Sequence, residues 1–208
     1  MQNLNRITWL TIIWLVLALA LPAEDASLET FLERLKPLSQ SRTIQAEYTQ
    51  TRHISDLDFD LTVKGRLAQE QDQRLAWMTE TPLKSICIFT SESFRMWDAE
   101  SGKTNVLNAA KYPWIRMIFE LQSAWMSGNA EVLKRAFALR VLDECTLELS
   151  PFSETAALFF TRISVTMAPD FLSVERAVFT EPSGDTITIV FTQMQRDAPI
   201  PETTWQLP

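Results

Sequence analysis

Few side chains in this sequence are of the types that catalyse reactions, and their spacing builds no familiar catalytic site. The one histidine, His53, follows a polar stretch and fits a solvated strand residue better than a catalytic triad or a metal site. Gly102-Lys103-Thr104 resembles the end of a phosphate-binding loop, but Trp97 occupies the position of that motif's first glycine. A hydrolase with two facing carboxylates stays open, because the sequence does not show which carboxylates face each other. We expect no enzymatic activity, no cofactor and no metal ion.

The N-terminal segment has the pattern of a secretory signal peptide. Arg6 precedes the apolar run Ile7–Leu21, and the small residue Ala23 is followed by Glu24 and Asp25. The apolar run is shorter than the ~20 residues that a membrane-spanning helix needs. We therefore expect residues 1–23 to be a cleaved signal peptide and residues 24–208 to form a single exported, periplasmic domain that begins at Glu24.

The charge of the chain excludes some classes of partner. The formal net charge is −7 at neutral pH, which argues against nucleic acid and against charge-driven binding to anionic lipid surfaces. An exported protein meets an oxidising compartment, so a disulfide between Cys87 and Cys145 is allowed, but the sequence does not show whether the two residues are close enough. One disulfide and two buried thiols therefore both stay open.

Most of the remaining chain has the alternation of β-strands. In Phe59–Leu67, apolar residues alternate with charged and polar ones, which is typical of a sheet with one face against an apolar interior. A first helix capped by Ser27 is expected, which Pro37 bends or ends, and a short helix capped by Asn129 is expected to end at about Phe137. Further strands are predicted at 44–49, 74–81, 85–90, 93–98, 138–143, 146–149, 159–167, 172–180 and 185–193, with an edge strand at 203–207. The pattern predicts a mainly β fold with a few α-helices, in which a single curved antiparallel sheet forms an incomplete, half-open barrel.

One apolar segment, Tyr112–Met126, breaks the strand pattern. Pro113 suits the start of a helix, and Gly128 suits the position just after its end. Large residues recur at helical spacing, so they share one face. This helix either packs in a closed core or forms a lid over an apolar cavity, where Met side chains adapt to varied ligands. The predicted lid residues are Trp114, Met117, Ile118, Leu121 and Trp125.

Apolar residues on one face of the strands are the candidates for the wall of such a cavity. The chain holds seven Trp and twelve Phe, which is many for its length. A curved one-sided sheet around a hollow accommodates such side chains and holds small or chain-like ligands. The predicted lining residues are Phe59, Leu61, Val63, Leu67, Leu75, Trp77 and Met96.

These segments, taken in order, resemble the LolA family of periplasmic carriers of lipoproteins. Each motif alone is weak, but their order and spacing span most of the expected mature chain. The resemblance rests on Ala46-Glu47-Tyr48-Thr49-Gln50, Gly65-x-Leu67, Arg74-Leu75-Ala76-Trp77, the Pro82 that follows, Phe94-Arg95-Met96-Trp97-Asp98, Ile187-Thr188-Ile189-Val190-Phe191, Ile200-Pro201 and Trp205.

The resemblance implies a LolA-like carrier domain over residues 24–208, a monomer that binds acyl chains of lipoproteins under a helical lid. It also implies transfer from an inner-membrane ATP-driven transporter to an outer-membrane acceptor. One departure concerns the Arg-Pro pair with which the family helps to hold its lid closed. Counting from Gly65, that pair falls on Gln71 and Asp72, and Arg74 is expected to point to the opposite face. The cargo is therefore either a lipoprotein or another lipid, such as a lipid-linked pigment intermediate.

Overall fold

The computed structural model describes residues 23–71 and 73–208. The expected signal peptide, residues 1–23, lies outside the described residues except for Ala23, and Asp72 lies outside them as well. In the described part, none of the helices is long and apolar enough to cross a membrane.

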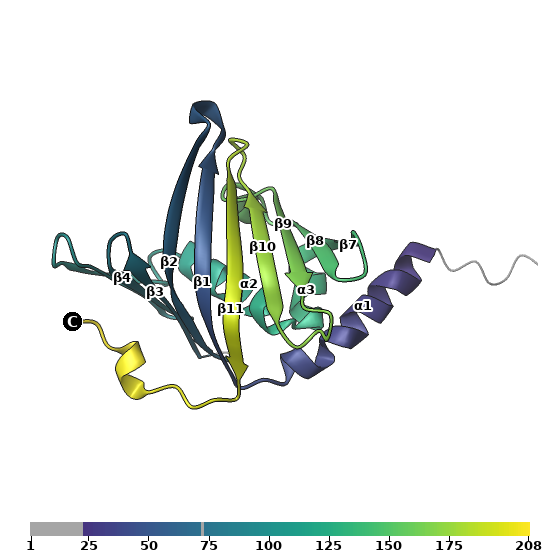
Figure 1. Cartoon of the computed structure of the whole chain (residues 1–208), viewed down its shortest axis with the longest axis horizontal. Coiled ribbons are helices and arrows are strands. Elements are labelled where there is room, and N and C mark those ends of the chain that lie inside the picture. Colours follow the sequence, from purple (N-terminus) through teal and green to yellow (C-terminus); the bar gives the residue numbers. More distant parts are fainter. Residues whose placement is uncertain (1–22, 72) are drawn as a thin grey trace, which may run out of the picture.

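Eleven described strands form one antiparallel sheet in the order β6-β5-β4-β3-β2-β1-β11-β10-β9-β8-β7 (Figure 1). The sheet is open, because β6 and β7 are its two edges, so the predicted half-open barrel is confirmed. Strand β6 was not predicted, and it is short, polar and largely exposed. The strands are β1 (Thr43–Ile54), β2 (Phe59–Glu70), β3 (Arg74–Thr81), β4 (Ser85–Thr90), β5 (Ser93–Asp98), β6 (Thr104–Asn108), β7 (Phe137–Val141), β8 (Thr146–Pro151), β9 (Arg162–Met167), β10 (Val174–Thr180) and β11 (Thr186–Arg196).

Helix α1 (Ala23–Ser39) packs through the apolar stripe that its sequence indicates. Pro37 was expected to bend or end this helix, and it does not end it, since the helix continues to Ser39. A proline this close to a helix end removes only one backbone hydrogen bond. The stripe residues Phe31, Leu32, Leu35 and Leu38 are buried.

Helix α2 (Trp114–Ser127) lies behind the central strands in the view of Figure 1. Pro113 occupies its N-cap, and Gly128 ends it with φ 63° and donates its backbone N–H to the carbonyl of Ala124. Only glycine adopts this left-handed conformation at little cost, so helix α2 ends here. Helix α3 (Ala130–Ala136) begins two residues after Gly128. A fourth helix, α4 (Glu154–Ala157), was not predicted.

Most of the core lies on the face of the sheet that the helices cover, which we call the concave face. Leu67 and Leu75, from β2 and β3, are buried there in one cluster with apolar residues of α1, α2 and α3. Alternation along a strand sends the intervening residues to the opposite, convex face. There Ala68, Ala76 and Ile88 form a second and smaller buried cluster.

The C-terminal tail covers this convex cluster. The prediction of an edge strand in the tail is wrong, because Glu202–Trp205 forms a 3-10 helix and the sheet gains no strand from it. Trp205 is buried over the small residues Ala68 and Ala76, where its ring finds apolar contact that an edge position would not offer. Arg74 donates two hydrogen bonds to Glu202, at 2.7 and 2.8 Å, and its guanidinium lies 4.5 Å from the Trp205 ring centroid.

Candidate functional site

A cavity of about 400 Å³ lies between the concave face and helix α2. On the sheet side, its wall follows three neighbouring strands. Gln50 of β1 is paired with Val63 of β2 on one side and with Ile189 of β11 on the other, and all three line the cavity. Ile187 extends the same wall. This row is apolar except for the Gln50 amide.

Strands β3 and β4 supply an aromatic and partly polar wall. Trp77 is paired with Cys87, and both side chains line the cavity. The hydroxyl groups of Tyr48 and Thr79 share a hydrogen bond of 3.0 Å, which satisfies two polar groups next to the apolar lining. Burial raises the pKa of the Tyr48 hydroxyl and raises the pKa of the Cys87 thiol to about 11. Cys87 is therefore a neutral thiol at physiological pH.

Helix α2 closes the cavity with one face and one polar contact. Ile118, Leu121 and Trp125 line the cavity from this helix. The indole Nε1 of Trp77 donates a hydrogen bond of 2.9 Å to Oε1 of Gln122. This contact joins the sheet directly to the helix that covers it.

The second half of the chain completes the wall. Phe159 and Phe160 follow α4, and Phe179 comes from β10. The Phe179 ring packs edge-on against Trp125, with ring centroids 5.7 Å apart. Glu181, just after β10, brings a carboxylate to the lining.

Five of the twelve predicted lining and lid residues line this cavity. They are Val63 and Trp77 from the sheet, and Ile118, Leu121 and Trp125 from α2. The other two lid residues lie beside the cavity. Trp114 has its ring centroid 6.4 Å from that of Phe94, and Met117 packs against the concave core.

The other five predicted strand residues lie elsewhere on the sheet. Leu67 and Leu75 are 1% and 0% exposed and belong to the filled core, in the same cluster as apolar residues of α1 and α2. Phe59 and Leu61 are 52% and 47% exposed, near the tip of the long β1–β2 hairpin at the top of Figure 1. Met96 pairs with Cys87 but is not among the lining residues.

The position of the family's arginine lies away from the cavity. Gln71 donates a hydrogen bond of 3.3 Å from its side chain to the carbonyl of Ser39, at the end of α1. Arg74 bonds Glu70 and Glu202, so it holds the tail rather than α2. Both cysteines are free thiols, with Cys87 at the cavity and Cys145 packed against the concave core.

Sequence reasoning missed the polar partner on α2 and the entire wall from the second half of the chain. Gln122 interrupts the apolar face of α2, and a polar residue at such a position indicates a polar partner across the interface. The alternation of Ile187, Ile189 and Phe191 was a second signal. Within residues 23–71 and 73–208, no group of three or more metal-ligating side chains comes together.

Comparisons with known proteins agree with this architecture. No curated protein matches the chain. An uncharacterised conserved protein from Thermus thermophilus has a crystal structure with a TM-score of 0.53 at 12% identity, covering 88% of this chain and 94% of that one. A LolA superfamily protein from Nitrosomonas europaea gives a TM-score of 0.45 at 8% identity, covering 86% and 97%. The family model for the outer membrane lipoprotein carrier protein LolA matches residues 39–207, which is most of the chain, and the protein therefore belongs to the LolA family.

Proposed function

We propose that this protein is a carrier that binds acyl chains in the cavity under α2 and moves them through the periplasm. The observation that carries the proposal is an apolar cavity covered by a single helix, in a chain whose family is that of a lipoprotein carrier. Each methylene group that leaves water for such a cavity contributes ~0.8 kcal/mol to binding.

The volume of the cavity indicates how much cargo it accepts with α2 in place. At ~30 Å³ per methylene group, about the share of one water molecule, the 400 Å³ accommodate one acyl chain of about a dozen carbons. A cargo with several chains requires α2 to move away from the sheet. A lipid with a single chain fits without that movement, so a lipid other than a lipoprotein remains the second candidate.

Reversible transport requires that the apolar face of α2 and the acyl chain of the cargo compete for the same surface of the sheet. In the empty protein, α2 buries Ile118, Leu121 and Trp125 against the sheet. Cargo replaces part of these contacts. The free energy of binding is therefore the difference between the contacts that cargo gains and those that α2 loses. A carrier built in this way holds its cargo without trapping it.

The proposed route follows from the family and from the expected export of the chain. Residues 1–23 direct the protein to the periplasm and are removed before Glu24. A monomer then accepts cargo from an inner-membrane ATP-driven transporter and delivers it to an outer-membrane acceptor. N-terminal sequencing of periplasmic material tests the first step, and crosslinking in the periplasm identifies the cargo and the partners.

The decisive experiment is ligand binding by the purified mature protein. An apolar fluorescent dye should bind the empty protein and should be displaced by a fatty acid, and native mass spectrometry should detect co-purified acyl chains. Absence of dye binding and of lipid would show that the interior functions only as a core.

A further inference from the structure

Arg52 lies beside the cavity lining, near the tip of the β1–β2 hairpin. It is two residues beyond Gln50 on β1, so both side chains lie on the concave face. Its neighbours across the sheet are Ile187, which lines the cavity, and the half-exposed Leu61. Arg52 therefore occupies the row next to the lining, on the side of the hairpin tip.

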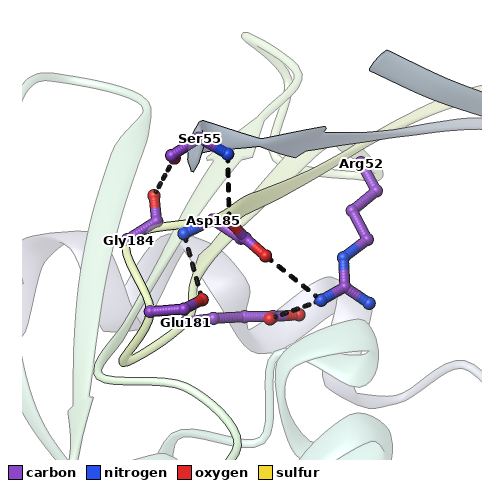
Figure 2. Close-up of polar contacts among 6 residues, drawn as sticks. Arg52, Ser55, Glu181, Gly184 and Asp185 are labelled. Atoms are coloured by element: carbon purple, nitrogen blue, oxygen red, sulfur yellow. Dashed lines mark hydrogen bonds and ion pairs between the residues drawn. The ribbon is translucent and has the colours of Figure 1, made fainter. Parts of the chain in front are cut away.

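Two carboxylates hold Arg52 in place. Its Nη2 donates to Oε2 of Glu181 at 2.8 Å and to Oδ2 of Asp185 at 3.3 Å (Figure 2). Glu181 itself lines the cavity, so this ion cluster belongs to the rim of the cavity. We call these three residues the rim cluster.

The rim cluster is fixed before any ligand arrives. Oδ1 of Asp185 accepts the backbone N–H of Ser55 at 3.0 Å, and the Ser55 hydroxyl donates to the Gly184 carbonyl at 2.8 Å (Figure 2). These contacts tie the β10–β11 turn to the tip of the β1–β2 hairpin, and the Ser55 N–H lowers the pKa of Asp185. A site held in this way loses little conformational freedom when it binds.

Arg52 has N–H groups that its two carboxylate partners do not use. A guanidinium carries five N–H groups, and the hydrogen bonds of Arg52 to Glu181 and Asp185 use the same nitrogen, Nη2. Its Nε is buried, and no described residue accepts from it. The side chain as a whole is 41% exposed, and its Nη1 has no hydrogen-bond partner among the described residues, so the Nη1 N–H groups are the donors that an acceptor oxygen of a ligand can reach.

The charge of the rim cluster decides which acceptor fits. One arginine faces two carboxylates, which leaves a net negative charge at the rim. A carboxylate or phosphate head would be repelled by this excess, and a quaternary ammonium head would offer Arg52 no acceptor. An uncharged carbonyl supplies the acceptor without either conflict.

We propose that the rim cluster is the head-group site of the cavity, and that it takes an acyl chain attached to an uncharged head through an ester or amide carbonyl, which accepts from Arg52. The proposal rests on the proposed function, because it assumes that the chain occupies the cavity. A glyceride ester and the acylated end of a lipoprotein both present such a carbonyl.

Displacement of the fluorescent dye by four amphiphiles of equal chain length tests the proposal. The four are a monoacylglycerol, an N-acylated peptide, a fatty acid and an alkyltrimethylammonium salt, measured at pH 8. The two carbonyl-linked ligands should displace the dye at about tenfold lower concentration than the fatty acid, a difference of ~1.4 kcal/mol. If only one of them does so, it identifies the source of the cargo.

Three variants assign the effect to the rim. Arg52→Gln should weaken the carbonyl-linked ligands about tenfold, while Glu181→Gln should tighten the fatty acid because it removes the excess charge. Arg66→Gln is the matched control, since Arg66 pairs with Glu80 at 2.7 Å on the convex face, and it should change neither ligand. Thermal unfolding of each variant checks that it is folded.

The outcomes separate the two proposals. Equal displacement by all four ligands, unchanged by Arg52→Gln, would overturn the head-group site and leave the cavity as a chain-binding site. Tightest binding of the ammonium salt would also overturn it. If none of the four displaces the dye, the proposed function fails together with the head-group site.

Discussion

The hydrogen bond between Trp77 and Gln122 joins the side chains of the sheet to the cavity face of α2. Both residues line the cavity, so the bond lies at the interface that cargo would open under the proposed function. The family's latch position, Gln71, instead contacts the end of α1. In this chain, the polar contact between the sheet and α2 therefore comes from Trp77 and Gln122, not from Gln71.

Gln122→Leu should loosen the helix that covers the cavity. The substitution keeps the bulk of the side chain but leaves the indole N–H of Trp77 without its acceptor, which costs ~1 kcal/mol. The open state should then be populated about fivefold more. Gln71→Arg is the matched control and should have little effect, because that position is not part of the cavity lining.

Cys87 reports on this opening directly. Burial raises the pKa of its thiol to about 11, and only the thiolate reacts with alkylating agents, so labelling should be slow at pH 8 in the closed protein. In a Cys145→Ser background, Gln122→Leu should accelerate labelling about fivefold, as followed by mass spectrometry. An unchanged rate would show that packing alone, above all by Trp125, holds α2 in place.

At the scale of the elements, α2 and the C-terminal tail cover opposite faces of the same strands. Trp125 buries its ring on the concave face, with its ring centroid 6.0 Å from that of Phe191. Trp205 buries its ring on the convex face, where Arg95 donates to its backbone carbonyl at 3.0 Å. The two tryptophans are 3% and 4% exposed, so they form a matched pair that separates ligand binding from stability.

Trp125→Ala and Trp205→Ala should both destabilise the fold, each by about 3–5 kcal/mol, because each removes a buried indole. Only Trp125→Ala should also change dye binding, since only Trp125 lines the cavity. Thermal unfolding and dye titration of the two variants test this. An equal loss of dye binding in both would mean that the two faces of the sheet are coupled.

At the scale of the whole molecule, the concave face is filled at one end and open at the other. Leu67 and Leu75 are buried in one cluster with residues of α1, α2 and α3, whereas Val63 and Ile187 line the cavity. The filled end stabilises the sheet, which under the proposed function leaves the open end to exchange contacts with cargo. Among the described strands, the two edges of the sheet, β6 and β7, do not pair with each other.

Cargo should therefore stabilise the whole domain. At a ligand concentration of a hundred times Kd, binding to the folded state alone contributes ~2.7 kcal/mol, which raises Tm by about 5–10 °C for a domain of this size. Differential scanning calorimetry with and without a monoacylglycerol measures the shift. An unchanged Tm at saturation would contradict binding to the folded protein.

The sequence by itself determined most of the elements and their faces. Strands 74–81, 85–90 and 93–98 form at the predicted residues, and the helix between Pro113 and Gly128 was also expected. These features depend on contacts and backbone preferences that repeat every two to four residues, so they can be read locally. The family's motifs, spread along the chain, likewise indicated the curved sheet.

Only the tertiary structure decided which apolar residues fill the core and which line a cavity. Leu67 and Val63 lie on the same face of β2, but Leu67 is fully buried in the core whereas Val63 is partly buried and lines the cavity. The pairing of Arg52 with Glu181, 129 positions apart, and the burial of Trp205 on the convex face depend on the same long-range placement. Burial and charge pairing are set by neighbours in space, and periodicity along a strand or helix records only which side a residue faces, not what it meets there.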